Sequence, residues 1–486
     1  MTPAKQNHRV QLLPKAPTGI PGMDEITGGG LPKGRPTLVA GGAGCGKTLF
    51  ATEFLVNGAI DYDEPGVFMS FEENADELAQ NVASLGFDLK KLGRQKKLII
   101  DNVHVERSEI EETGDYDLEG LFIRLGHAID SIGARRVVLD TIEVLFSALT
   151  NQGILRAELQ RLFRWLKDKG VSAVITAERG EGSMTRFGLE EYVADCVILL
   201  DHRVNEQMST RRLRIVKYRG TLHGTNEYPF LITKDGISVL PITSLGLDHQ
   251  ASEVRVSTGV KELDSMLGGK GYYRGSSVLL SGTAGTGKSS LSAAFVDAAC
   301  RRGERCLYFS FEESTNQILR NMRSINIDLE PHVKKGLLQF HVSRPTLYGL
   351  EMHLVTMHDL IKKHKPEVVV LDPITDFFAV GSTSEVKAAI TRIIDFLKTN
   401  QVTALLTSYT EEDTPNESVV GVSSLIDTWI SLRNIENNGE RHRGLFILKS
   451  RGMPHSNQIR SFELTSNGIK IGDMDLSGRR NELSPI

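Results

Sequence analysis

The chain has 486 residues, of which 40% are apolar and 24% are charged. This length and composition predict more than one domain with a sizeable core, and they exclude a disordered chain, a collagen-like chain and a small disulfide scaffold. The 57 Lys and Arg residues against 61 Asp and Glu residues give a net charge of −4, which provides no general attraction for nucleic acid or an anionic membrane.

Short β-branched runs alternate with longer helical patterns along the chain. In the first half, residues 48–59 and 156–170 are predicted helices, and the predicted strands are 37–41, 66–71, 97–101, 135–140, 172–177 and 196–201. Several of these runs are apolar at consecutive positions, as is typical of strands buried on both faces. The alternation predicts an α/β fold with a mostly parallel sheet flanked by helices.

The second half of the chain repeats the first. Residues 18–56 match residues 258–296 at an offset of 240 (258 minus 18), which is far too long for a solenoid repeat. Further along, Asp140 matches Asp372 at an offset of 232 (372 minus 140), so the first half contains an insertion of 8 residues (240 minus 232), which we place in the acid-rich stretch 104–117. We therefore expect a duplicated domain, with the boundary near residues 243–256.

Each copy contains a glycine-rich loop of the pattern G-x-x-x-x-G-K-[ST] between a predicted strand and a predicted helix. In such loops the glycines let backbone N–H groups wrap around phosphate, the lysine reaches the β and γ phosphates, and the hydroxyl binds Mg²⁺. Two matches at equivalent positions argue against a chance pattern. The predicted ATP-binding residues are Gly41, Gly44, Gly46, Lys47 and Thr48 in the first half, and Gly282, Gly285, Gly287, Lys288 and Ser289 in the second.

A nucleotide site of this type needs a second acid at a strand end to hold the hydrated metal ion. Asp140 and Asp372 each end an apolar run, so we predict that they serve as metal ligands together with Thr48 and Ser289. The alternative role for these aspartates is that of a helix N-cap.

Adjacent glutamates, Glu72–Glu73 and Glu312–Glu313, end the repeated pattern x-F-x-S-F-E-E. We expect them at strand ends, where neighbouring side chains point to opposite faces and have different surroundings. One glutamate of each pair is predicted to orient or deprotonate a nucleophile near the γ-phosphate. The alternative is a pair of solvated loop acids.

Two basic pairs, Lys217/Arg219 and Lys449/Arg451, recur on predicted strands with a spacing of two, so each pair is expected to project from one strand face. Such a pair is suited to completing the nucleotide site of a neighbouring subunit, as arginine fingers do. The alternative is a solvated basic edge strand. The basic stretch 211–219 lacks interleaved aromatic residues for base stacking, so a nucleic-acid partner is not expected.

The sequence also bears on the cellular compartment. The N-terminus lacks the apolar stretch of a secretory signal, and no apolar run approaches the roughly 18 residues of a membrane span. The cysteines form no C-x-x-C pair, which argues against structural zinc and predicts free buried thiols: Cys45, Cys196, Cys300 and Cys306. We therefore expect a cytoplasmic protein.

The order of these motifs resembles the KaiC family of circadian-clock ATPases. Residues 29–48, 64–73, 134–140, 190–200 and 218–230 resemble the first half of the family pattern, and residues 309–330 and 419–432 resemble the second. The resemblance covers nearly all of residues 16–472. It implies a first RecA-like ATPase domain at 16–245 and a second RecA-like autokinase and autophosphatase domain at 246–472, with an N-terminal arm at 1–15 and a C-terminal tail at 473–486.

The resemblance further implies a double-ring homohexamer that binds ATP and Mg²⁺ between subunits, hydrolyses ATP slowly in the first ring and phosphorylates itself in the second. The family's adjacent phosphorylated hydroxyls fall on Ser423 and Ser424, which without the resemblance would be taken for a cap or a turn. A Ser–Ser pair in place of Ser–Thr resembles a KaiC subgroup outside the strict cyanobacterial clock. The first half has Glu190–Glu191 at the comparable place, without a hydroxyl to accept phosphate.

Partners follow from the same resemblance. Residues 104–117 lie where the family's first ring receives KaiB, so the resemblance allows a KaiB-like protein as a partner of this chain. The tail matches the family's KaiA-binding tail poorly, which argues against a KaiA partner. Two alternatives to a self-phosphorylating regulatory or timing ATPase are a DNA-dependent ATPase of the RecA or RadA type and an ATP-binding scaffold without turnover. The net charge and the absence of a zinc ribbon disfavour the former, and the intact Glu72 and Glu312 disfavour the latter.

Overall fold

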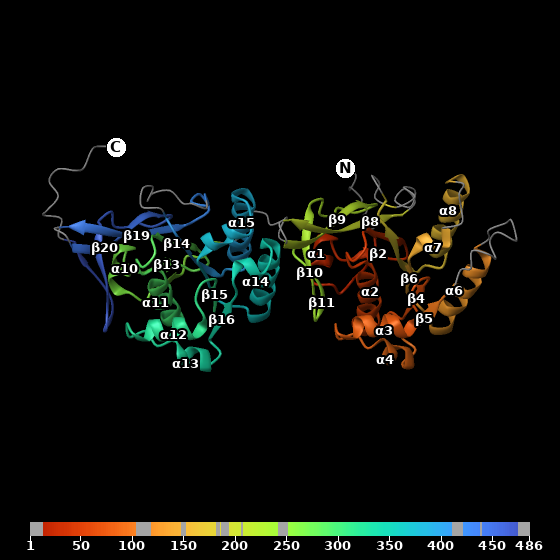
Figure 1. Ribbon diagram of the computed structural model, residues 1–486, viewed down its shortest axis with the longest axis horizontal. Coiled ribbons are helices and arrows are strands. Elements are labelled where there is room, and N and C mark those ends of the chain that lie inside the picture. Colours follow the sequence, from red (N-terminus) through yellow and green to blue (C-terminus); the bar gives the residue numbers. More distant parts are fainter. Residues whose placement is uncertain are drawn as a thin grey trace, which may run out of the picture. The chain divides into compact units, whose positions relative to one another are not determined.

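The computed structural model describes residues 13–103, 118–146, 152–180, 185, 194–205, 208–241, 251–410, 421–437 and 440–474. The chain divides into two compact units, residues 1–244 and 245–486. Each unit contains a nine-stranded, mostly parallel sheet flanked by helices, which confirms the predicted α/β fold (Figure 1). The predicted insertion at 104–117 and the pair Glu190–Glu191 lie outside the described residues.

The sheet of the first unit has the strand order β11-β10-β9-β8-β3-β7-β6-β4-β5. Its six parallel strands are β3 (Pro36–Gly41), β4 (Gly66–Ser70), β5 (Leu98–Asn102), β6 (Arg136–Asp140), β7 (Ser172–Glu178) and β8 (Cys196–Asn205). The antiparallel strands are β9 (Met208–Tyr218), β10 (Glu227–Thr233) and β11 (Gly236–Val239), and a separate pair joins β1 (Lys15–Ala16) to β2 (Leu31–Pro32). All six strands predicted from the sequence are thereby confirmed.

Helices cover both faces of this sheet. They are α1 (Met23–Ile26), α2 (Lys47–Asp61), α3 (Ala75–Ala83), α4 (Leu89–Arg94), α6 (Glu119–Ile132), α7 (Ile142–Phe146) and α8 (Gln152–Asp168). Side chains alternate along β3, so Val39 joins the core with Phe54 of α2, whereas Leu38 joins the opposite core with Leu125 of α6 and Leu159 of α8. Because both faces are covered, the strands are apolar at consecutive positions.

The second unit repeats this arrangement, with the strand order β16-β15-β17-β18-β14-β19-β20-β21-β22. Its strands are β14 (Ser277–Gly282), β15 (Cys306–Ser310), β16 (Leu338–Val342), β17 (Val368–Asp372), β18 (Thr403–Ser408), β19 (Thr428–Asn437), β20 (Glu440–Ser450), β21 (Arg460–Thr465) and β22 (Gly468–Asp473), with a separate pair of β12 (Arg255–Val256) and β13 (Tyr272–Tyr273). Its helices are α10 (Lys261–Met266), α11 (Lys288–Arg301), α12 (Thr315–Arg323), α13 (Glu330–Lys334), α14 (Leu350–His364) and α15 (Thr383–Thr399), with short 3₁₀ turns at Pro345–Leu347 and Ile374–Ala379.

Capping residues fix where several helices begin. The side chain of Asn74 accepts hydrogen bonds at the start of α3, and Glu77 reaches back to the Asn74 backbone. Ser314 and Gln317 make the same reciprocal arrangement at the start of α12. Each cap satisfies backbone donors that the helix itself leaves unpaired. The turns that follow the glutamate pairs are therefore held at equivalent places in both units.

Two expectations on strand ends are wrong in detail. Strands β4 and β15 end at Ser70 and Ser310, so the glutamate pairs lie in the bends that follow rather than on the strands. Arg219 and Arg451 lie one residue beyond β9 and β20, so each basic pair straddles the end of a strand. Backbone pairing of β4 and β15 stops before the glutamates, whereas pairing of β9 and β20 includes the lysine of each basic pair and stops before the arginine.

Candidate nucleotide sites

The phosphate loop of each unit connects a buried central strand to a helix. In the first unit β3 ends at Gly41 and α2 begins at Lys47, and in the second β14 ends at Gly282 and α11 begins at Lys288. Gly287 has a φ of 100°, and a Cβ atom at this position would lie 2.5 Å from the ring of Phe462. Only glycine therefore fits this turn without displacing its neighbour.

The loop lysines lie across the loop and are buried. The Nζ atom of Lys47 donates to the carbonyls of Gly41 and Gly42, both at 3.0 Å. The Nζ atom of Lys288 donates to the carbonyls of Gly282 at 2.8 Å and Thr283 at 2.9 Å. Burial lowers the pKa of Lys288 to about 8, against the opposing effect of the nearby Asp372 and Glu312 carboxylates. Both ammonium groups thus stand beside the backbone N–H groups that would bind phosphate.

The predicted metal-binding aspartates are the last residues of β6 and β17, and both are buried. Asp140 accepts a hydrogen bond from Thr176. Burial raises the pKa of Asp140, and hydrogen bonds from Thr176 and Thr48 oppose that rise. The Thr48 hydroxyl and the Asp140 carboxylate therefore lie side by side, and together they form the hard oxygen donor set that suits Mg²⁺.

The second aspartate has a different donor set. Asp372 accepts hydrogen bonds from Thr407 and from the hydroxyl of Tyr308. Thr407 of β18 corresponds to Thr176 of β7, because the two strands pair with β17 and β6 in the same register. The first unit has Phe68 in place of Tyr308. The second aspartate is thus held by two hydroxyl donors of its own domain. Ser289 and Asp372 line the same cavity, which is the arrangement that shared metal binding requires.

The two members of each glutamate pair have different surroundings. Glu73 accepts a hydrogen bond from Asn81 at 3.2 Å, and Glu313 accepts one from Asn321 at 2.9 Å, so these members are tied to the helix that follows. Burial, reinforced by Asp372 and Glu312, raises the pKa of Glu313. The other members, Glu72 and Glu312, are exposed and are held from another direction.

Glu72 and Glu312 are held by residues that follow other strands of the sheet. Glu72 accepts a hydrogen bond of 3.0 Å from Thr141, the residue after Asp140. Glu312 accepts one of 2.7 Å from the hydroxyl of Tyr409, which follows β18. Both glutamates therefore face the carboxyl ends of the central strands, where the phosphate loop also begins.

A cavity of about 380 Å³ brings the predicted residues of the second unit together. It is lined by the phosphate loop, both glutamates, the metal-site aspartate and Tyr409, including Gly285, Gly287, Lys288, Ser289, Glu312, Glu313 and Asp372. These residues come from the ends of four strands, β14, β15, β17 and β18, and from the start of α11. The arrangement places a carboxylate, a buried aspartate and a lysine around one space large enough for a polyphosphate.

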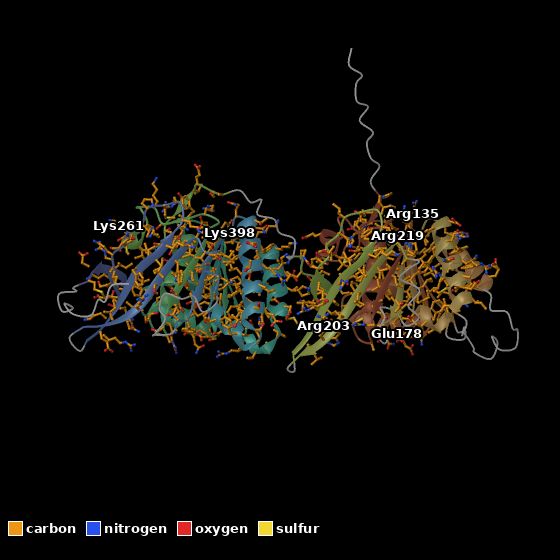
Figure 2. All side chains as sticks on the ribbon, turned by 90° about the horizontal axis from the view of Figure 1, so that it is seen from above. Arg135, Glu178, Arg203, Arg219, Lys261 and Lys398 are labelled. Carbon is orange, nitrogen blue, oxygen red and sulfur yellow. The ribbon has the colours of Figure 1, made fainter. Side chains whose placement is uncertain are left out.

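The basic pairs lie at the opposite end of the sheet from the phosphate loop of their own unit. In β9, Lys217 is paired with Val197 at the start of β8, whereas the phosphate loop follows the far end of β3. Figure 2 shows Arg219 and Glu178 at opposite sides of the first unit, with Glu178 on the loop side. The same holds for Lys449, which is paired with Trp429 at the start of β19. The structure therefore does not bring these pairs together with the loop of the same unit.

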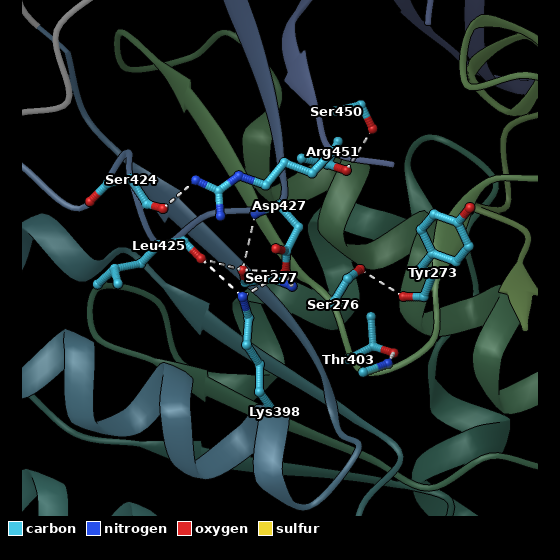
Figure 3. Close-up of polar contacts among 12 residues, drawn as sticks. Tyr273, Ser276, Ser277, Lys398, Thr403, Ser424, Leu425, Asp427, Ser450 and Arg451 are labelled. Atoms are coloured by element: carbon cyan, nitrogen blue, oxygen red, sulfur yellow. Dashed lines mark hydrogen bonds and ion pairs between the residues drawn. The ribbon is translucent and has the colours of Figure 1, made fainter. Parts of the chain in front are cut away.

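In the second unit these basic side chains instead hold the turn that carries Ser423 and Ser424, and Figure 3 shows Arg451 at the Ser424 carbonyl. Lys449 donates to the Ser423 carbonyl at 2.6 Å, and Arg451 donates to the Ser424 carbonyl at 2.6 Å. Lys398 of α15 donates to the next carbonyl, that of Leu425, at 3.0 Å. Three successive carbonyls thus accept hydrogen bonds from three different cations, which fixes the backbone of the turn.

Asp427 anchors the other end of this turn. Its carboxylate forms an ion pair of 2.8 Å with Lys398 and accepts hydrogen bonds of 2.9 Å from both the backbone N–H and the hydroxyl of Ser277 (Figure 3). The Lys398 ion pair and the Ser277 hydrogen bonds lower the pKa of Asp427, overcoming the opposite effect of burial. The turn is therefore attached to the first residue of β14.

Sequence reasoning missed Thr141, Tyr308, Tyr409 and Lys398, because none belongs to a recognised loop motif. A signal was available for two of them: aligning the two halves places Phe68 against Tyr308 and Glu178 against Tyr409. Differences at equivalent positions of a duplication mark places where the two sites diverge.

The cysteines behave as predicted, since Cys45, Cys196, Cys300 and Cys306 are free and buried. In the part of the chain that the structure describes, no helix is both long and apolar enough to cross a membrane.

Comparison with known proteins agrees with this geometry. The family model for the KaiC ATPase matches residues 16–244 and 256–475. The chain is 58% identical over 468 residues to circadian clock protein KaiC2 of Synechocystis sp., covering 96% of this chain and 82% of that protein. It is 38% identical to circadian clock oscillator protein KaiC of Synechococcus elongatus, covering 97% of this chain and 92% of that protein.

A third relative is circadian clock protein KaiC3 of Synechocystis sp., with 37% identity over 95% of this chain and 92% of that protein. These matches support a KaiC-like regulatory ATPase that binds nucleotide, and they do not support the alternative of a DNA-dependent ATPase of the RecA or RadA type. The doubled phosphate loop, the strand-end aspartates and the paired glutamates are the residues expected of such an enzyme. The chain belongs to the KaiC ATPase family.

Proposed function

We propose that this protein is a hexameric double-ring ATPase that phosphorylates Ser423 and Ser424 on neighbouring copies of the same chain. We propose that it acts as a regulatory or timing protein. The observation that carries the proposal is the position of the serines: they precede β19, whereas the phosphate loop follows the other end of the adjacent β14. β14 has six residues, so the strand alone separates them by roughly 17 Å.

That separation excludes direct transfer within one unit and favours transfer between subunits. A ring arrangement places the serine end of one subunit against the phosphate loop of the next. The same arrangement would bring Lys217 and Arg219, or Lys449 and Arg451, to the nucleotide of the neighbouring subunit. Within their own unit these residues lie away from the phosphate loop. ATP bound at such an interface contacts both subunits and therefore strengthens assembly.

The chemistry follows from the second cavity. Glu312 accepts the proton of the serine hydroxyl while the oxygen attacks the γ-phosphorus; the bond from that phosphorus to the β–γ bridging oxygen breaks, and ADP leaves. Lys288 stabilises the negative charge on the transferring group. Mg²⁺, when bound, would neutralise charge on the β and γ phosphates, and Ser289 and Asp372 are the side chains that would hold it. Thr48 and Asp140 are the side chains that would hold Mg²⁺ in the first unit.

The two units differ in whether they offer a hydroxyl group that can accept phosphate. The first unit has Glu190–Glu191 where the second has its serines, so it offers no hydroxyl there and is proposed to hydrolyse ATP with Glu72 as the residue that orients water. Of each glutamate pair, we assign the chemical role to the member that is not tied to an asparagine. We further propose a cytoplasmic location and retain a KaiB-like protein, but not KaiA, as a partner.

Replacement of both serines by alanine tests the proposal. After incubation with Mg²⁺ and γ-³²P-ATP, the wild-type chain is expected to incorporate label at Ser423 or Ser424, as located by mass spectrometry. The double Ser→Ala variant is expected to lose incorporation and keep hydrolysis by the first unit. A matched control replaces Ser265 and Ser384, two exposed helix serines of the same unit that do not line the cavity, and should retain labelling. Undiminished labelling of the Ser423/Ser424 variant would place the acceptor elsewhere.

A further inference from the structure

Tyr409 occupies a central place in the second cavity that none of the motifs explains. Its hydroxyl donates a 2.7 Å hydrogen bond to Oε2 of Glu312. The Nζ atom of Lys288 lies 4.3 Å from the centre of its ring, which is close enough for a cation–π interaction. One half-buried side chain thus contacts both the carboxylate proposed as base and the lysine proposed to bind phosphate.

The equivalent position in the first unit is occupied by Glu178. The equivalence rests on backbone contacts, since the N–H groups of the following residues, Arg179 and Thr410, donate to the strand-end carbonyls of Gly41 and Gly282 respectively. A carboxylate at this position carries the same charge as the neighbouring glutamate and cannot donate a hydrogen bond to it. The first unit therefore needs another donor for Glu72.

That donor is Thr141, and its counterpart in the second unit is Pro373, which has no hydrogen-bond donor at all. The two changes are complementary. In the first unit Thr141 donates and Glu178, the last residue of β7, does not; in the second unit Tyr409, just after β18, donates and Pro373 does not. Each site thus keeps one hydroxyl donor on its exposed glutamate, but the donor comes from a different strand end.

The physical effect of the hydroxyl is to limit the orientations of Glu312. An exposed glutamate side chain samples several rotamers, whereas a hydrogen bond to a carboxylate is among the stronger ones that proteins form. Burial and the Glu312 carboxylate both raise the pKa of Tyr409, so the phenol keeps its proton and remains a donor. The ring meanwhile holds the Lys288 ammonium on the same side of the cavity.

We propose that Tyr409 is a positioning residue for phosphoryl transfer at the second site, acting on the orientation of Glu312 through its hydroxyl and on Lys288 through its ring. The inference deepens the proposed function and rests on it for the role of Glu312 as the base near the γ-phosphate. It does not need the acceptor to be Ser423 or Ser424, because the same carboxylate would also orient water for hydrolysis in that cavity.

The test uses the full chain with Glu72→Gln and Glu73→Gln, which silences the first unit while leaving its phosphate loop intact. In this background Tyr409→Phe removes only the hydroxyl. It is expected to lower kcat for second-unit turnover about tenfold, as loss of one hydrogen bond to a charged group does, while KM for ATP stays within about twofold. Tyr409→Ala also removes the ring and is expected to raise KM in addition.

A double-mutant comparison identifies the partner. If Tyr409 acts through Glu312, then Tyr409→Phe changes the residual rate of the Glu312→Gln variant by less than about twofold. A matched control, Thr141→Val in the otherwise native chain, should lower first-unit hydrolysis and leave second-unit transfer unchanged. Hexamer content and thermal unfolding of Tyr409→Phe should equal those of the parent.

The outcomes are separable from those of the proposed function. A Tyr409→Phe variant with native kcat, or one whose defect is fully additive with Glu312→Gln, overturns the inference. A parent chain that turns over ATP in its second unit but labels no serine contradicts the kinase proposal, and the kcat comparison still decides the role of Tyr409. Phosphate found on Tyr409 itself would also overturn a purely positioning role.

Discussion

The ammonium group of Lys449 donates a 2.6 Å hydrogen bond to the backbone carbonyl of Ser423. Burial and the neighbouring Arg451 lower the pKa of Lys449, while Asp427 opposes the shift. In the proposed ring the same lysine serves the nucleotide of the adjacent subunit, and it cannot make both sets of contacts with the same geometry. Nucleotide at the interface and a fixed acceptor turn therefore compete for one side chain.

The first prediction concerns that turn. Lys449→Met removes a charge-assisted hydrogen bond, so backbone hydrogen exchange across residues 421–427 is expected to accelerate about fivefold, corresponding to about 1 kcal/mol. Hydrogen-exchange mass spectrometry measures the change. Lys261→Met removes an exposed charge at the start of α10 in the same unit and should leave that segment unaffected. Identical exchange in both variants would show that Lys449 does not hold the turn.

Hydrolysis and self-phosphorylation should separate by unit. Glu72→Gln with Glu73→Gln is expected to cut steady-state ATPase at least tenfold and leave phosphate incorporation into the second unit largely intact, because the two cavities have separate glutamates. Glu312→Gln should do the reverse. Both activities are measured on the same samples, as released phosphate and as protein-bound ³²P. Equal loss of the two activities in either variant would mean that the units are chemically dependent on each other.

Assembly should depend on nucleotide. Lys47→Ala removes the ammonium group that lies across the first phosphate loop and is expected to weaken assembly of the first ring and to abolish most hydrolysis. Sedimentation with and without ATP measures the assembly state. Lys90→Ala, which breaks only an exposed ion pair with Asp76, is the control and should assemble normally. A hexamer that survives both Lys47→Ala and removal of nucleotide contradicts a role for ATP at the interface.

The stability of the first unit should fall between pH 4.5 and pH 7 because of Glu53. This carboxyl is buried in α2 and accepts a 2.9 Å hydrogen bond from the Ile237 N–H. Burial raises its pKa to about 7, above its ordinary value of 4.5. In that window the folded state therefore binds more protons than the unfolded state, so the free energy of unfolding decreases as pH rises, by about 2–3 kcal/mol, and levels off above pH 7.

Glu53→Gln keeps an oxygen that can accept the Ile237 hydrogen bond and removes the titration. Its free energy of unfolding should exceed that of the parent at pH 8 and change less between pH 5 and pH 8. Denaturant-dependent hydrogen exchange in peptides from α2 reports on this unit alone. Glu25→Gln, which alters an exposed carboxylate of the same unit, is the control. Parallel pH profiles for the parent and Glu53→Gln would rule out Glu53 as the source.

The sequence was sufficient for the features that depend on local pattern. The strand, loop and helix around Lys47 and Lys288 follow from consecutive apolar residues and from glycines whose positions a loop geometry requires. The aspartates Asp140 and Asp372 lie at strand ends as their runs indicated. Duplication strengthened each of these predictions, because an independent copy of the pattern recurred.

Contacts between distant segments could not be predicted in the same way. Thr141 lies 69 residues from Glu72, and Tyr409 lies 97 residues from Glu312, so which hydroxyl reaches which carboxylate depends on the order of strands in the sheet. The contact of Lys449 with the Ser423 carbonyl likewise depends on β20 lying antiparallel beside β19. Periodicity fixes the faces of one strand but not its neighbours.

The residue at the end of β7 or just after β18, Glu178 or Tyr409, also determines how a small molecule would distinguish the two nucleotide sites of one chain. A simple triphosphate mimic meets the same loop pattern in both units, so it has little basis for preferring either. Glu178 would repel an added anionic or electron-rich aromatic substituent near the terminal phosphate, whereas Tyr409 offers a ring face and a phenol. An ATP analogue extended in that direction would therefore inhibit the second unit selectively, giving a reagent that silences one half of a duplicated enzyme without any mutation.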